Sequence, residues 1–119
     1  MTYPRQGDFV FLDAEPHAGH EIGGHSPSSG NVRRPFLVLS GDAYNQKTGF
    51  VYVMAISSKH RDSFFRQRII DYASGINGDL LLTQVPQYDF SARHGEIVGH
   101  IKDKNLFDDI LDIFLQIFE

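Results

Sequence analysis

The stretch RPFLVLSGDAYNQKTGFVYVMAISS, residues 34–58, decides the fold that we expect for this chain. It holds two runs of apolar, β-branched and aromatic residues, FLVLS at 36–40 and GFVYVMAIS at 49–57, which are typical of strands. The first run is too uniformly apolar for a strand with one face in water, so we predict that it is buried. Between the two runs, GDAYNQKT at 41–48 predicts a turn or a single helical turn.

Similar runs lie on both sides of this stretch. Four more segments have the composition of strands: residues 7–14, 64–72, 80–85 and 95–101. The pair Asn77-Gly78 predicts a hairpin turn before one of them. Because the runs recur about every 8 to 15 residues, the sequence predicts a small all-β barrel or sandwich.

The C-terminal residues have a helical period instead. Asn105 is the expected N-cap, and LFDDILDIFLQIFE at 106–119 predicts the helix. Its apolar face consists of Phe107, Ile110, Leu111, Phe114 and Phe118, widened by Leu106, Ile113 and Ile117. A face this broad favours a partner, although a helix that packs wholly on its own barrel is an equal alternative.

Composition narrows the functional classes. Residues 1–119 have the size of a single domain, with 41% hydrophobic and 22% charged residues. No segment approaches the roughly 18 apolar residues of a membrane span, so we expect no contact with a membrane. The N-terminal residues lack a secretory pattern, which predicts a cytoplasmic protein. The chain has no cysteine, which excludes disulfides, thiol catalysis and cysteine-based zinc sites.

Charge is unevenly distributed along the chain. The net charge of −4 arises entirely in residues 103–119, which carry five carboxylates and one lysine. Residues 33–68 carry two carboxylates and seven basic side chains, namely Arg33, Arg34, Lys47, Lys59, Arg61, Arg66 and Arg68. Because phosphate neutralisation dominates nucleic-acid binding, this basic segment is the part that we expect to face a polyanion.

A segment rich in glycine, serine and histidine, HAGHEIGGHSPSSGN at 17–31, cannot be regular secondary structure. A loop this long inside a compact domain is usually functional or disordered. His17, His20 and His25 raise a metal site as one interpretation. Their spacings do not fix tetrahedral ligands as a helical H-x3-H does, so we expect solvated histidines and no metal.

Arg33 and Arg34 stand at the junction of this loop with the first buried strand. Pro35 biases Arg34 towards an extended backbone, which holds it where loop and strand meet. A guanidinium presents a planar fork of donors that matches a phosphate. A solvated arginine pair at the start of a strand is the alternative.

Ser57 and Ser58 follow the buried run VYVMAI and precede Lys59, His60 and Arg61. Hydroxyl groups at the end of a core strand, next to three potential cations, predict a phosphate cradle. A Ser-His-Asp triad is a further interpretation, but the G-x-S-x-G elbow is missing, and adjacency in sequence gives no triad geometry.

The order of these motifs resembles the MazF/PemK family of toxin endoribonucleases, the Kid/ChpA group, from bacterial type II toxin–antitoxin systems. The matching pieces are QGDFVFLDAEPHAGHE at 6–21, residues 34–58, and LLLTQVPQYDFSARHGEIVGHI at 80–101, followed by a terminal helix. The resemblance implies one MazF/PemK-like domain over residues 1–119. This domain would be mainly β: an SH3-like small barrel with a C-terminal α-helix and a long loop at about 17–33.

The resemblance also assigns site residues. The family's essential arginine falls on Arg34, its essential Thr or Ser on Ser57, and the acidic residue of its G-x-E loop motif on Glu21; these three are the expected catalytic residues. Gln84 and Arg93 fall on family positions that line the RNA groove. The expected substrate-binding set is completed by the neighbouring polar residues: Arg33, Ser58, Lys59 and His20.

Two departures from the family pattern bear on this site. Glu21 and Arg34 are 13 positions apart, more than is usual in the family, so the loop that gates the RNA site is longer here. Glu21 therefore need not sit where the family places it. Phe64-Phe65 followed by Arg66 replaces the family's Pro-Phe-acidic stretch, which leaves the RNA sequence preference open.

The chemistry that the resemblance implies is metal-independent cleavage of single-stranded RNA, with no cofactor. RNA supplies its own nucleophile, the 2′-OH, so the protein needs a proton acceptor, a proton donor and stabilisation of the phosphorane charge. We expect Arg34 to stabilise that charge and Ser57 to hold a phosphoryl oxygen, giving 2′,3′-cyclic phosphate and 5′-hydroxyl ends. Glu21 and His20 are the candidate bases, because an arginine is a poor base at neutral pH.

The implied partners are a second copy of the chain, in a homodimer, and a cognate antitoxin in the bacterial cytoplasm. An acidic, initially disordered C-terminal antitoxin tail would fold along the dimer and fill the RNA groove. DNA would be contacted only indirectly, through the antitoxin complex. Because fold does not decide function, a non-catalytic SH3-like binding module, a gyrase-inhibiting toxin of the same fold and a metal-dependent nuclease stay open.

Overall fold

Two antiparallel strands formed by residues 34–58 lie at the centre of the computed structural model, which describes residues 2–119. β2 (Arg33–Val38) pairs with β3 (Phe50–Ser57) in a register that sets Phe36 opposite Ala55. The segment between them forms α1 (Asp42–Thr48), which is longer than the predicted single turn. Asn45 of α1 is buried and donates to the carbonyl oxygens of Pro4 and Ser40, so this connection is part of the packed domain.

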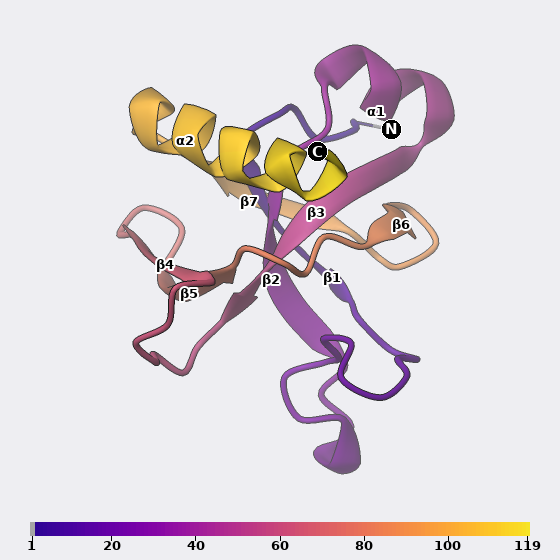
Figure 1. Ribbon diagram of the computed structural model, residues 1–119. Helices are drawn as coiled ribbons and strands as arrows, with labels where there is room; N and C mark the ends of the chain where they lie inside the picture. The colour runs from indigo at the N-terminus through magenta and orange to yellow at the C-terminus, as the bar shows by residue number, and fades with distance from the viewer. Residues whose placement is uncertain (1) are drawn as a thin grey trace.

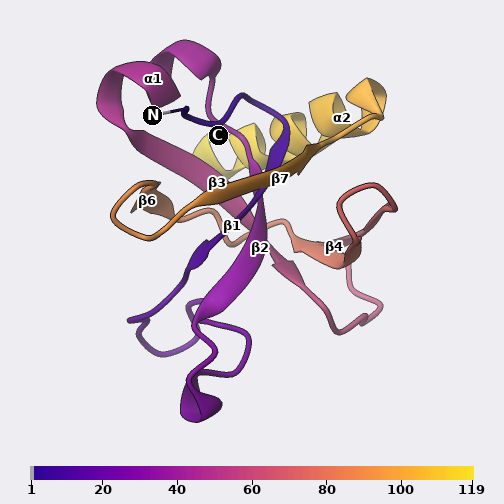
Figure 2. The same cartoon turned by 180° about the vertical axis from the view of Figure 1, so that it is seen from behind.

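The other strands extend this pair into one curled sheet (Figures 1 and 2). The added strands are β1 (Asp8–Asp13), β4 (Arg66–Asp71), β5 (Ile76–Leu81), β6 (Gln87–Asp89) and β7 (Glu96–His100). The order is β4-β5-β3-β2-β1-β7, with β6 paired to β3 and every pairing antiparallel. The prediction of a mainly β, SH3-like barrel is confirmed.

Both faces of the central strands are buried, as their continuous apolar sequence predicts. Side chains alternate between the faces, so Leu37 and Met54 join one core cluster, while Phe36 and Val53 join the other. The first cluster is covered by α2 (Lys104–Leu115), which buries Phe107 against it (Figure 1). Arg34 follows the same alternation as Phe36, and this places its side chain on the face away from α2.

The predicted hairpin turn at Asn77-Gly78 is wrong. Both residues lie inside β5, and the chain reverses at residues 72–75, where Gly75 has a φ of +77°. Gly78 is required for another reason: a Cβ there would clash with the carbonyl oxygen of Ser57 on the adjacent strand. The Gly residue thus marks close contact between two backbones, and β5 begins earlier than the predicted run at 80–85.

The predicted N-cap of the C-terminal helix is also wrong. Asp103, not Asn105, caps α2, because its carboxylate accepts the Leu106 backbone N–H at 3.0 Å. Asn105 lies in the first turn of the helix. The apolar face is only partly covered: Phe107 and Ile110 are buried, whereas Phe118, in a 3-10 turn (Gln116–Phe118), is 74% exposed.

This cap gives a simple stability prediction. Asp103→Ala removes the acceptor for the Leu106 N–H, so we expect the free energy of unfolding to fall by about 1 kcal/mol. Asn105→Ala is the matched control and should change it by less than about 0.5 kcal/mol. Urea denaturation measures both, and equal losses for the two variants would contradict the assignment.

Candidate functional site

Arg34 is held in a fixed position near the start of β2. Its side chain is 9% exposed and donates three hydrogen bonds: Nε to the Gly23 carbonyl oxygen, Nη1 to that of Ile56 at 2.9 Å, and Nη2 to that of Gly24 at 3.4 Å. A guanidinium has five N–H donors, so two are left for another acceptor. The alternative of a solvated arginine is excluded for this residue.

The surroundings of Arg34 alter its acid–base properties. Burial lowers the pKa of the Arg34 guanidinium from its ordinary value, and the nearby Tyr88 hydroxyl acts in the opposite direction. Burial also raises the pKa of Tyr88, while the guanidinium of Arg93, stacked 4.2 Å from the centre of the Tyr88 ring, lowers it. Tyr88 therefore stays protonated at neutral pH and is a hydrogen-bond donor beside Arg34.

Ser57 lies at the end of β3, one residue after the carbonyl that holds Arg34. Its hydroxyl oxygen accepts the Lys59 backbone N–H at 3.3 Å, which fixes the turn that leads out of the strand. Ser58 and Lys59 are exposed on this turn. The structure thus brings together the predicted residues Arg34, Ser57, Ser58 and Lys59 where β2 begins and β3 ends.

The long loop, residues 14–32, packs over Arg34 and is tied down at several points. Glu15 accepts the Gly24 N–H at 2.7 Å, and the Gln84 amide bonds both the Ile22 N–H and the His20 carbonyl. Arg93 donates to the carbonyl oxygens of Asp13 and Glu15. Gln84 and Arg93, which the sequence predicts to line an RNA groove, here hold the loop.

This loop is not entirely irregular, contrary to the prediction for residues 17–31. Pro27–Ser29 form a turn of 3-10 helix, and Ser26 forms a β-bridge with Asn31. Gly24 is buried where a Cβ would collide with the backbone of Val32. A glycine at this position therefore lets the loop approach Arg34.

The predicted residues Glu21 and His20 lie on the same loop, and both are exposed. The Glu21 carboxylate accepts the Ala18 N–H at 2.8 Å. Among residues 2–119, no hydrogen bond or ion pair joins either side chain to Arg34. The negative charge of Glu21 adds to burial in raising the pKa of Tyr88.

The carboxylate of Glu15 is the group that fixes the loop next to Arg34. The Gly24 N–H, and then the imidazole of His17 at 2.6 Å, lower the pKa of Glu15 from 4.5. A lowered carboxylate pKa means that the hydrogen bond to Gly24 is fully present above the ordinary value and is lost as the pH falls through the lowered one.

We therefore expect Glu15→Gln to increase amide hydrogen exchange at Gly24 at neutral pH. In the wild-type protein, protection of Gly24 relative to its intrinsic exchange rate should decrease only below about pH 4.5. Glu21→Gln, which alters a carboxylate bonded to Ala18 instead, is the control and should leave Gly24 protected. Equal Gly24 protection in wild type and Glu15→Gln would contradict the role of Glu15.

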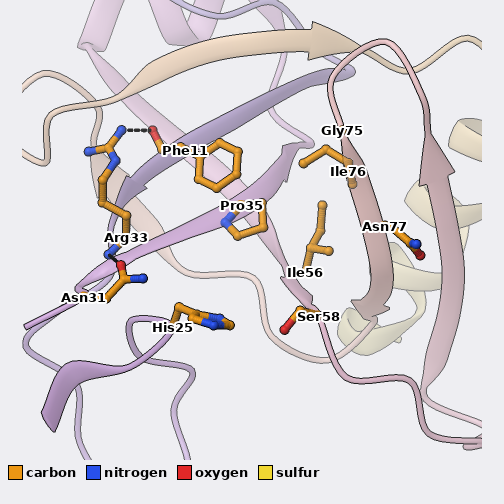
Figure 3. Close-up of a pocket in the computed structure, with 10 residues that line it drawn as sticks. All are labelled: Phe11, His25, Asn31, Arg33, Pro35, Ile56, Ser58, Gly75, Ile76 and Asn77. Carbon is orange, nitrogen blue, oxygen red and sulfur yellow. Dashed lines mark hydrogen bonds between the residues drawn. The ribbon is translucent and has the colours of Figure 1, made fainter. Parts of the chain in front are cut away.

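Arg33 lies apart from Arg34, because neighbouring residues of a strand point to opposite faces. Its guanidinium bonds the Asp13 carboxylate at 3.2 Å and the His94 carbonyl oxygen at 3.0 Å. It also bonds the carbonyl oxygen of Phe11, as Figure 3 shows. Arg33 thus lines a cleft that Arg34 does not line.

The structure also bears on the metal site and the Ser-His-Asp triad that the sequence raised as alternatives. Within residues 2–119, no three His, Asp or Glu side chains form a cluster that could hold a metal, and His17 is paired with Glu15. His60 bonds the buried Asp79 at 2.8 Å, but no hydrogen bond in the described chain joins His60 to Ser57, so a triad is not assembled. In the same residues, no helix is long and apolar enough to cross a bilayer.

Sequence reasoning missed two residues of this region, Tyr88 and Asp79. Tyr88 influences the pKa of Arg34 because β6 pairs with β3, a long-range pairing that no local pattern indicates. Asp79 could have been noticed from a weak signal in the sequence. It is a carboxylate inside the otherwise apolar run INGDLLL at 76–82, and residues 33–68 supply an excess of basic side chains that could pair with it.

Comparison with known proteins agrees with this geometry. A family model described as PemK-like, MazF-like toxin of type II toxin–antitoxin systems matches residues 5–118. The crystal structure of MazF from Deinococcus radiodurans has 26% sequence identity and a TM-score of 0.84, over 99% of this chain and 98% of that one.

More distant structures share the fold. A MazE–MazF complex from D. radiodurans has 20% identity and a TM-score of 0.76, over 99% of this chain and 97% of that one. An endoribonuclease in complex with its cognate antitoxin, from a mycobacterial species, has 15% identity and a TM-score of 0.66 over 95% of each chain. UPF0346 proteins of Bacillus mycoides and Bacillus cereus are 32% identical over 72 residues, 60% of this chain and 96% of theirs.

Proposed function

Because the chain belongs to the PemK-like, MazF-like toxins of type II toxin–antitoxin systems, we propose that it is a sequence-specific endoribonuclease of the bacterial cytoplasm. Its substrate is single-stranded RNA, above all mRNA, and cleavage inhibits translation and growth. The observation that carries this proposal is the proximity of Arg34 and Ser57 where β2 begins and β3 ends, linked through the Ile56 carbonyl oxygen, which accepts from Arg34.

The reaction is an attack of the ribose 2′-oxygen on the adjacent phosphorus. The bond from phosphorus to the 5′-oxygen breaks, the 2′-OH loses its proton to a base, and the departing 5′-oxygen takes up a proton. The products are a 2′,3′-cyclic phosphate and a 5′-hydroxyl. Arg34 neutralises the charge on the non-bridging oxygens through guanidinium N–H groups other than the one that bonds Ile56.

Ser57 holds a phosphoryl oxygen through its hydroxyl, and the exposed Lys59 beside it draws in the RNA backbone. Glu21 and His20 remain the candidate bases. The lowered pKa of Arg34 also favours a part for this residue in proton transfer, because it makes loss of a proton easier than for a solvated arginine.

In this mechanism the loop over Arg34 must open before the phosphate binds. The carbonyl oxygens of Gly23, Gly24 and Ile56 accept from three of the five guanidinium N–H groups, and the loop covers the buried side chain. Binding of RNA exchanges the two loop carbonyls for phosphoryl oxygens, which are stronger, charged acceptors.

The experiment is incubation of the purified protein with labelled single-stranded RNA in EDTA. Cleavage at a short motif is the expected result. If the protein cleaves no RNA but traps DNA gyrase, it is a gyrase-inhibiting toxin and the proposal is wrong. If it does neither, the non-catalytic binding module is the remaining interpretation. Cleavage that EDTA abolishes would show a metal-dependent nuclease.

We propose in addition that the toxin is a homodimer bound by a cognate antitoxin with an acidic C-terminal tail. Exposed basic side chains at Lys59, Arg61 and Arg68 suit such a tail, and the MazE–MazF neighbours have the same fold. DNA is contacted only through that complex. An acidic protein encoded next to the toxin should suppress its toxicity when the two are co-expressed, and it should co-purify with the toxin. Sedimentation equilibrium of the toxin alone should give the mass of a dimer.

A further inference from the structure

A cleft of about 460 Å³ opens on the sheet face opposite the Arg34 side chain (Figure 3). This volume is within the roughly 300–1,000 Å³ of typical small-ligand sites. The cleft lies between the β1–β2 ribbon and the β4–β5 turn and is lined by Phe11, His25, Asn31, Arg33, Pro35, Ile56, Ser58, Gly75, Ile76 and Asn77. The expected catalytic residues Arg34, Ser57 and Glu21 do not line it.

The walls of this cleft are apolar. Phe11 and Pro35 lie on one side of the opening and Ile56 and Ile76 on the other (Figure 3). Ile56 and Ile76 are buried, while Phe11 and Pro35 keep part of their surface exposed to the opening. Two apolar walls, one of which carries an aromatic ring, suit a flat ring system better than a flexible chain.

The rim is polar, and its amide groups are oriented. The Asn77 side-chain oxygen accepts from the Arg68 guanidinium at 2.8 Å, and the Asn31 oxygen accepts the Arg33 backbone N–H at 3.3 Å. Because a guanidinium and a backbone N–H can only donate, the amide oxygens are fixed, and both NH₂ groups remain as donors. In residues 2–119, neither NH₂ group makes a hydrogen bond.

The charged side chains around the cleft favour a ligand that is part of a polyanion. No carboxylate lines the cleft among the described residues, and Lys59 and Arg61 follow Ser58 directly on the exposed turn. The cleft also adjoins the proposed reaction centre, because the side chain of Ile56 lines it while the carbonyl oxygen of the same residue holds Arg34. A nucleotide next to the scissile phosphate would meet both conditions.

We propose that this cleft is the pocket for one base of the RNA substrate and that its rim selects a base with carbonyl acceptors. The inference rests on the proposed function and adds to it a determinant of sequence preference. The NH₂ groups of Asn31 and Asn77 donate to carbonyl oxygens of uracil or guanine. Adenine has no carbonyl oxygen, and its ring nitrogens lie beside or away from an amino group that cannot accept from these donors.

The test uses Asn77→Asp and Asn31→Asp, which exchange the NH₂ donor for an oxygen. Each keeps the oxygen that Arg68 or the Arg33 N–H requires, so the local structure is retained. Asn105→Asp makes the same chemical change on α2, away from the cleft, and is the matched control. The probes are short 2′-fluoro RNA strands, which lack the nucleophile and differ in one base, and binding is followed by fluorescence anisotropy.

We expect the wild-type protein and Asn105→Asp to prefer uracil or guanine over adenine at one position by roughly tenfold. Asn77→Asp and Asn31→Asp should reduce or reverse that preference at this position alone. An unchanged preference in both variants, or no preference in the wild type, would overturn the proposal. Weaker antitoxin capture by these variants without a change in base preference would assign the cleft to the antitoxin and overturn it as well.

This design separates the pocket from the cleavage reaction. Base preference with uncleavable strands, in a protein that cuts no RNA, would support the pocket and refute the endoribonuclease. Cleavage of RNA at the same sites by the wild type, Asn77→Asp and Asn31→Asp would support the endoribonuclease and refute the pocket.

Discussion

Arg34→Lys is expected to lower the rate of RNA cleavage by roughly 10²–10³-fold. Lysine keeps the positive charge, but its ammonium cannot reproduce the planar fork that bonds Ile56 on the protein side while leaving two N–H groups for the phosphate. The loss should fall mainly on kcat, because the charge on the phosphorane develops in the transition state. Single-turnover cleavage of a labelled RNA measures it.

Two measurements keep this result interpretable. Arg5→Lys makes the same exchange at an exposed position near the N-terminus and should cleave at the wild-type rate. Because Arg34 also holds the Gly23 and Ile56 carbonyl groups, the fraction of folded Arg34→Lys at the assay temperature is obtained from circular dichroism and used to correct the rate. A corrected rate equal to that of the wild type would contradict the role of Arg34.

Asp79→Asn is expected to lower the free energy of unfolding by about 2–3 kcal/mol. Asp79 is fully buried opposite Ser57, and its carboxylate accepts from His60 at 2.8 Å, the Arg61 backbone N–H at 2.9 Å and Arg66 at 3.3 Å. An asparagine cannot accept at both side-chain atoms, so one of these donors is left facing an NH₂ group. Urea denaturation at neutral pH measures the change.

The matched control is Asp62→Asn, since Asp62 also pairs with His60, at 3.2 Å, but is fully exposed. It should change the free energy of unfolding by less than about 0.5 kcal/mol. Burial raises the pKa of Asp79, but the hydrogen bonds from His60, Arg61 and Arg66 outweigh it, so the pKa is lower than 3.8. The stabilisation is thus present above the ordinary pKa and disappears as the pH falls through the lowered one. Equal stability of the two variants would contradict this account.

The strands of residues 34–58 were predictable because their pattern needs no knowledge of the partner strand. An unbroken run such as FLVLS leaves no face for water, and the structure buries both faces. The errors have a different cause. Gly78 has the sequence of a turn but is needed where two backbones touch, and Asp103 rather than Asn105 caps α2 because the helix begins earlier than its apolar period.

The candidate site also contains some residues whose positions the sequence predicts and others whose positions it does not. Arg34 and Ser57 come together through the register of two adjacent strands, which the order of motifs already indicates. Tyr88 reaches Arg34 through a distant strand, and Glu21 is positioned by the conformation of a long loop, so neither position follows from local sequence. The catalytic roles of Arg34, Ser57 and Glu21 stay predictions until variants are assayed.

Replacing the 2′-OH at a single cleavage site by hydrogen tests the central claim most directly. The wild-type protein, in EDTA, is incubated with an RNA strand and with the same strand carrying one 2′-deoxynucleotide at the mapped cut, and the product ends are analysed. The account predicts 5′-hydroxyl and 2′,3′-cyclic phosphate ends from the RNA and no cut at the 2′-deoxy position. Cleavage at that position, or 5′-phosphate ends, would contradict it.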